Sequence, residues 1–63
     1  MQVTQEMVGK RILFRRKPVS FYVEATVLEL TPGGRVKIRY AGGGADRWFD
    51  NDGYEVDVVE VLT

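Results

Sequence analysis

The stretch RYAGGGADRWFDNDGYEVD, residues 39–57, concentrates side chains that could do chemistry: three adjacent glycines, a Trp-Phe pair and a cluster of acidic residues. Glycine-rich loops cradle phosphates, spaced carboxylates bind calcium, and paired carboxylates can act as acid and base. Each of these chemistries requires a particular spacing, which the sequence can be checked against.

Calcium binding by an EF-hand loop requires a glycine at the sixth position and a bidentate glutamate at the twelfth. Placing Gly53 at the sixth position puts Trp48 first and Val59 twelfth, and neither side chain can coordinate a cation. The fragment Asn51-Asp52-Gly53 is therefore interpreted as a turn.

The chain also lacks the residues that a P-loop and the common catalytic sites require. The three glycines are not followed by the Gly-Lys-Ser/Thr end of a P-loop, and the chain contains neither histidine nor cysteine. Ser20 has no base beside it in sequence, and the carboxylates of Asp50 and Asp52 are expected to be solvated in a turn. We expect a protein that is not an enzyme and has no metal or cofactor.

The chain has 63 residues, so we expect one domain, 1–63, with 1–8 as a lead-in arm or a helical turn. Its net charge is zero. The absence of cysteine fits a reducing compartment, and no apolar run is long enough to span a bilayer. These features predict an intracellular, cytoplasmic protein without a membrane partner, either monomeric or weakly self-associating.

Hydrophobic alternation and turn residues predict five short strands and an all-β fold. The clearest is RVKIRY, where Val36, Ile38 and Tyr40 point one way and the basic residues the other. In FYVEATVLEL the apolar parity changes at Leu28, which predicts a bulge or a tight coil there. The alternation also places Phe21 on the core face. The expected strands cover residues 10–16, 21–30, 35–40, 47–49 and 56–62.

Several aromatic residues are predicted to lie at the mouth of a small barrel. Tyr40 ends its strand on the core parity, Trp48 follows the glycine loop, and Tyr22 and Phe14 belong to the first two strands. Rings around such a mouth attract cations, and methylated ammonium groups are common ligands. The alternative is that Phe14, Trp48 and the other large rings are simply core.

The order VEATVLEL, Pro-Gly turn, RVKIRYAGG, RWF and VDVVEVL resembles a Tudor-like (Tudor or Tudor-knot) domain of the SH3-like barrel group. The resemblance implies a five-stranded SH3-like barrel in which Tyr40 matches a cage aromatic. It implies that Phe14 and Tyr22 lie near two other cage positions, and that Trp48 could supply a further wall.

Three kinds of partner follow from these observations. The first is a peptide or a methylated basic side chain, bound by the rings with help from Asp46 or Asp50. The second is a nucleic acid, and the third is another protein that pairs with an edge strand. The basic side chains that would contact phosphate are Lys10, Arg11, Arg15, Arg16, Lys37 and Arg39.

The charges are sorted along the chain, with eight basic and three acidic residues in 1–45 and one basic and six acidic residues in 46–63. Such sorting can mark an anionic partner for one face. It can equally mark neighbouring strands of opposite sign that neutralise each other.

Overall fold

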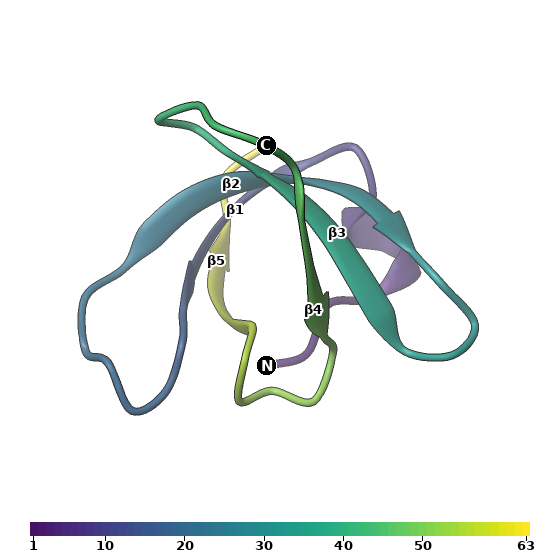
Figure 1. Cartoon of the computed structure of the whole chain (residues 1–63), viewed down its shortest axis with the longest axis horizontal. Coiled ribbons are helices and arrows are strands. Elements are labelled where there is room, and N and C mark those ends of the chain that lie inside the picture. Colours follow the sequence, from purple (N-terminus) through teal and green to yellow (C-terminus); the bar gives the residue numbers. More distant parts are fainter.

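Five antiparallel strands form a single sheet in the computed structural model, which describes all 63 residues. Their order across the sheet is β4-β3-β2-β1-β5 (Figure 1). The all-β class and the five strands are confirmed. The fold contains no helical segment with the length and hydrophobicity that a bilayer-spanning helix needs. The elements are the 3-10 turn η1 Gln5–Met7 and the strands β1 Arg11–Arg15, β2 Val23–Leu30, β3 Arg35–Tyr40, β4 Arg47–Asp50 and β5 Asp57–Val61.

Strand β3 has the predicted bounds and the predicted alternation. Val36 and Ile38 are fully buried, whereas Arg35 and Arg39 are exposed. The strand pairs with β2 on one side and with β4 on the other. Because it lies in the middle of three paired strands, its inner face becomes part of the core.

The turn between β2 and β3 follows from its composition. Gly34 takes a φ of +83°, which is unfavourable for residues with a Cβ atom, and its N–H donates to the carbonyl of Thr31 at 3.0 Å. The hydroxyl of Thr31 accepts the N–H of Arg35 at 3.0 Å. These two bonds close the turn and fix the start of β3.

The bulge predicted in β2 is confirmed. The register between β2 and β3 shifts between Val27 and Glu29, so that Leu28 is the extra residue. Val27 is fully buried before the shift, and Leu30 packs against the core after it. The bulge therefore lets both parities of the strand supply core residues.

The prediction that Phe21 belongs to the core is wrong. The ladder between β1 and β2 begins at the pair Phe14–Val23, so Phe21 and Tyr22 precede the strand and lie in the β1–β2 loop. The side chain of Phe21 is 65% exposed. Alternation in the sequence continues past the point where pairing with β1 ends.

Residues 1–8, expected to be a lead-in arm or a helical turn, contain η1 and contribute two core residues. Val3 and Met7 are buried. The N–H of Val58 donates to the carbonyl of Met1 at 2.7 Å, and the side chain of Asn51 both accepts from Val3 N–H and donates to its carbonyl, each at 2.8 Å. The segment thereby connects the end of β4 with β5.

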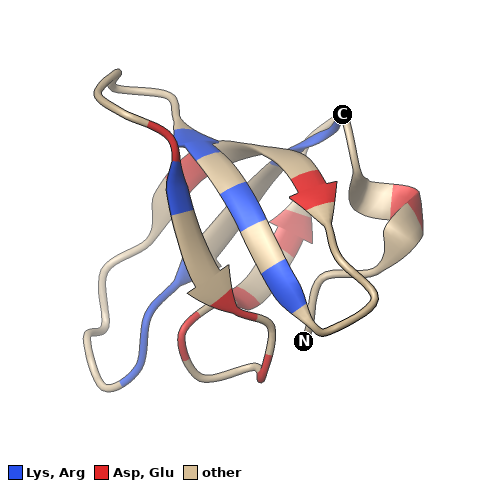
Figure 2. Cartoon of the chain, turned by 45° about the vertical axis from the view of Figure 1, so that its right-hand side comes forward, with Lys and Arg blue, Asp and Glu red and all other residues tan.

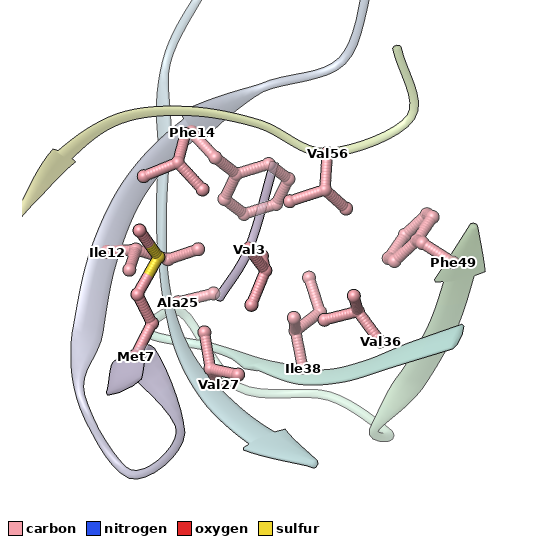
Figure 3. Close-up of a cluster of buried hydrophobic side chains, with 11 residues drawn as sticks. Val3, Met7, Ile12, Phe14, Ala25, Val27, Val36, Ile38, Phe49 and Val56 are labelled. Atoms are coloured by element: carbon pink, nitrogen blue, oxygen red, sulfur yellow. The ribbon is translucent and has the colours of Figure 1, made fainter. Parts of the chain in front are cut away.

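The sheet is curled (Figure 1), and the core side chains of the strands pack together with those of the N-terminal segment (Figure 3). All five strands contribute to it, and Val56 enters just before β5. The buried hydrophobic residues are Val3, Met7, Ile12, Phe14, Ala25, Val27, Val36, Ile38, Phe49, Val56 and Val58. Because the core is this small, each buried side chain matters to stability.

Candidate binding surfaces

The predicted aromatic residues divide between the core and two different surfaces. Phe14 is fully buried, so it cannot offer a face to a ligand, and its assignment as a ligand-binding residue is wrong. The side chain belongs to β1 and points inward because its strand neighbours Leu13 and Arg15 occupy the outer parity. The alternative interpretation of Phe14 as core is confirmed.

Tyr40 ends β3 on the inner parity and is half-buried. Its ring stacks on that of Phe14, with centroids 6.2 Å apart and an angle of 24° between the planes. Ala25 of β2 is its register partner, and the next residue, Ala41, donates its N–H to the carbonyl of Glu24 at 3.0 Å. Tyr40 thus lies at the end of the sheet where β2 begins.

Trp48 lies on the other face of the sheet. It pairs with Lys37, whereas the adjacent pair of the same ladder, Val36 and Phe49, is buried. Trp48 is 42% exposed, so the alternative that it belongs to the core is wrong. Since Tyr40 shares the inner parity of Val36, the two rings do not line one mouth.

The exposed rings Phe21 and Tyr22 lie in the β1–β2 loop, together with the exposed Val19. The loop is tied to the β4–β5 connection, because the N–H of Lys17 donates to the carbonyl of Tyr54 at 3.0 Å. Tyr22 directly precedes β2, so it lies at the same end of the sheet as Tyr40. The exposure of Phe21 was not predicted from its alternation with Val23, although the nearby Pro18 cannot donate to a strand ladder.

The two acidic candidates lie at opposite ends of β4 and already have basic partners. Asp46 accepts two bonds from the guanidinium of Arg39, at 2.9 and 3.1 Å, and this contact holds the pKa of Asp46 below its usual value. Asp50 pairs with Arg35 at 3.3 Å. The ligand-binding candidates therefore do not converge on one site.

Three of the six candidate phosphate contacts are already ion-paired. Arg11 pairs with Glu24 at 3.2 Å, and Arg15 with Asp57 at 3.1 Å. Arg39 pairs with Asp46, as described above. Lys10, Arg16 and Lys37 have no acidic partner within 4.0 Å, and the guanidinium of Arg16 lies 4.9 Å from the centroid of Phe49.

Much of the charge sorting is explained by pairing between neighbouring strands. Basic residues of β3 face Asp46 and Asp50 at the ends of β4, and the β1 residue Arg15 faces Asp57 at the start of β5. Figure 2 shows basic positions along β3 beside acidic positions at both ends of β4. Cross-strand neutralisation was the second of the two interpretations offered by the sequence.

Asp57 is the one buried charged residue and was missed by sequence analysis. Its carboxylate accepts from the terminal ammonium of Met1 and from Arg15, and Lys17 lies 3.7 Å away. The hydrogen bonds from the ammonium and from Arg15 lower its pKa to about 2. The residue therefore joins the N-terminal segment, β1 and β5 at one point.

The acidic turn after β4 is held by its own side chains. The carboxylate of Asp52 accepts the N–H groups of Tyr54 and Glu55 at 2.8 and 2.9 Å, and these bonds lower its pKa. Glu55 in turn accepts the N–H of Asp50 at 2.6 Å. The fragment Asn51-Asp52-Gly53 therefore belongs to a turn capped by side chains, as predicted.

No group of three or more His, Cys, Asp or Glu side chains is placed to hold a metal ion, and the surface has no pocket. Comparison with known proteins finds no matching family model, no similar curated protein and no similar solved structure.

Proposed function

We propose that the protein is a noncatalytic binding module for a peptide, or for a basic side chain of a peptide in its methylated form. The proposed site is the end of the sheet where the β1–β2 loop and the end of β3 lie. Its rings are Phe21, Tyr22 and Tyr40.

The observation that carries this proposal is the exposure of two adjacent rings at that end. Phe21 is 65% exposed and Tyr22 is 53% exposed, in a domain whose core is small and would gain from burying them. Exposed apolar groups gathered in one place usually mark an interaction site. Tyr40 adds a ring whose inner side is held against Phe14, so that its position is fixed before a ligand arrives.

We further propose that the curled sheet is a Tudor-like barrel of the SH3-like group. Three features support this: the bulged second strand, the strand order, and the N-terminal segment that connects β4 with β5 through Asn51 and Val58. If the edges are connected in this way, the amides of Val3 and Val58 should be protected from hydrogen exchange. Exchange of both amides at the rate of an unfolded chain would contradict the barrel.

The binding proposal is tested by titrating isotope-labelled protein with short peptides that carry methylated lysine or methylated arginine. We expect shifts in the resonances of Phe21, Tyr22 and Tyr40. The indole N–H of Trp48 serves as an internal control, because it lies on the other face and should not move.

Two variants make this test specific. Tyr22→Ala changes an exposed ring, so it should remove binding while leaving the fold intact. Tyr54→Ala removes an equally exposed ring from the β4–β5 turn and should leave the affinity unchanged. Equal binding by the wild type and Tyr22→Ala, or no shifts with any of the peptides, would refute the proposed site.

A further inference from the structure

The outer face of the β3–β4 hairpin carries a second exposed ring that the proposed peptide site does not use. Trp48 is the only tryptophan in the chain and lies in the middle of β4, 42% exposed. The ammonium of Lys37, its register partner on β3, lies 5.8 Å from the centroid of the indole ring. A flat aromatic surface and a cation thus lie side by side.

Lys37 is the middle of three basic residues on this face of β3, spaced about 7 Å apart along the strand (Figure 2). The outer two, Arg35 and Arg39, are paired with Asp50 and Asp46. Lys37 itself has no acidic partner within 4.0 Å, and Glu29, its register partner on β2, forms no ion pair. The cation beside the ring is therefore free to contact an anionic ligand.

We propose that this face binds single-stranded nucleic acid, with one base stacked on Trp48 and a neighbouring phosphate held by Lys37. Stacking on an exposed ring combined with cations along the backbone path is how proteins hold single strands without reading their sequence. An acidic peptide would use the cations but would give no reason for the exposed ring.

The two arginines that flank Lys37 can also contact phosphate if they give up their carboxylate partners. Water screens ion pairs at a protein surface, so phosphates can replace Asp46 and Asp50 as partners of Arg39 and Arg35 at little cost. The two carboxylates also limit the affinity, because they repel the strand.

The test uses the fluorescence of Trp48, which reports only on this face because no other tryptophan contributes. We expect an oligothymidylate of about ten nucleotides to quench this fluorescence at about 20 mM salt, with a log–log salt slope of roughly −0.7 for each phosphate contacted. Lys37→Ala should weaken binding several-fold, whereas Lys10→Ala should not. Absence of quenching at low salt would overturn the proposal, and so would equal quenching by polyglutamate.

A gain of affinity provides a second test that does not depend on disrupting the surface. Replacing Asp46 and Asp50 together by Asn should free Arg39 and Arg35, tighten oligothymidylate binding, and steepen the salt slope by about 0.7 for each freed cation. A matched control replaces Glu6 and Glu60 by Gln, which changes the net charge equally at other positions. An equal gain in the control would reveal only general attraction and would overturn the assignment to this face. Because the rings of the proposed peptide site are unchanged in all of these variants, the two proposals fail independently.

Discussion

Asp57 shows how one side chain can make stability depend on pH. It is buried against the terminal ammonium of Met1 and against Arg15, and its pKa in the folded protein is about 2. In the unfolded chain an aspartate has a pKa of about 3.9. Because the folded value is the lower one, the stabilisation from the carboxylate is fully present above about pH 4 and is lost as the pH falls towards 2.

We therefore expect the free energy of unfolding to decline between about pH 4 and pH 2, with Asp57 as a main contributor. Asp57→Asn should lower stability at pH 7 and flatten this dependence, as measured by urea unfolding at a series of pH values. Asp50→Asn, at an exposed carboxylate, is the control and should leave the dependence in place. An unaltered pH profile in Asp57→Asn would contradict the role given to this residue.

The contribution of core packing to stability can be tested by removing a single methylene group from Ile38. The residue is fully buried in the middle of β3, so Ile38→Val leaves a cavity of one methylene and should cost about 1 kcal/mol of unfolding free energy. Val59→Ala removes apolar atoms from a position that is about half-exposed and should cost less. The midpoints of thermal unfolding of the two variants give the comparison.

The β2–β3 turn contains two adjacent glycines, Gly33 and Gly34, that differ in backbone conformation. Gly34 has a φ of +83°, and no atom lies within 4 Å of an added Cβ, so Gly34→Ala costs only backbone strain, about 1–2 kcal/mol. Gly33 lacks a positive φ, and its added Cβ would meet the hydroxyl of Thr31 at an ordinary 3.9 Å.

Gly33→Ala should therefore be neutral or stabilise by a few tenths of a kcal/mol, because alanine restricts the unfolded chain. Chemical unfolding of both variants measures the difference. Equal stabilities of Gly33→Ala and Gly34→Ala would show that the turn does not have the conformation described.

The elements that sequence reasoning placed correctly are those with local signals. Alternation defined β3 over 35–40, and a change of parity located the bulge at Leu28. The error at Phe21 arose because a strand ends where its pairing ends, and the alternation alone does not show where pairing with β1 stops. The division of Tyr40 and Trp48 between two faces also depends on pairing, here the register of Lys37 with Trp48.

For the whole molecule, the N-terminal segment is the feature that the sequence did not reveal. Val3 meets Asn51, and Met1 meets Asp57 and Val58, so these contacts join residues that are far apart in the chain. The periodic patterns of a sequence describe single elements and contain no information on such contacts. The same limit explains why the buried charge of Asp57 was missed.

Asn51→Ala tests this connection. The change removes two hydrogen bonds and leaves the N–H and carbonyl of Val3 without partners, which should cost about 2–3 kcal/mol. Hydrogen exchange should accelerate at Val58, whose amide is bonded to Met1, more than at Val36 in the centre of the sheet. Uniform acceleration of the two amides would instead indicate that the segment and the sheet unfold only together.

Contacts at the edge strands β4 and β5 should reduce aggregation at high protein concentration. The amide of Val58 in β5 is occupied by Met1, and the amide of Asp50 in β4 by the carboxylate of Glu55. Open strand borders are templates on which further chains add, and such growth ends in fibrils. Both edge strands are short, and some of their outward amides are already hydrogen-bonded. We therefore expect this valine-rich chain to remain free of aggregates at concentrations where a sheet with open edge strands would aggregate.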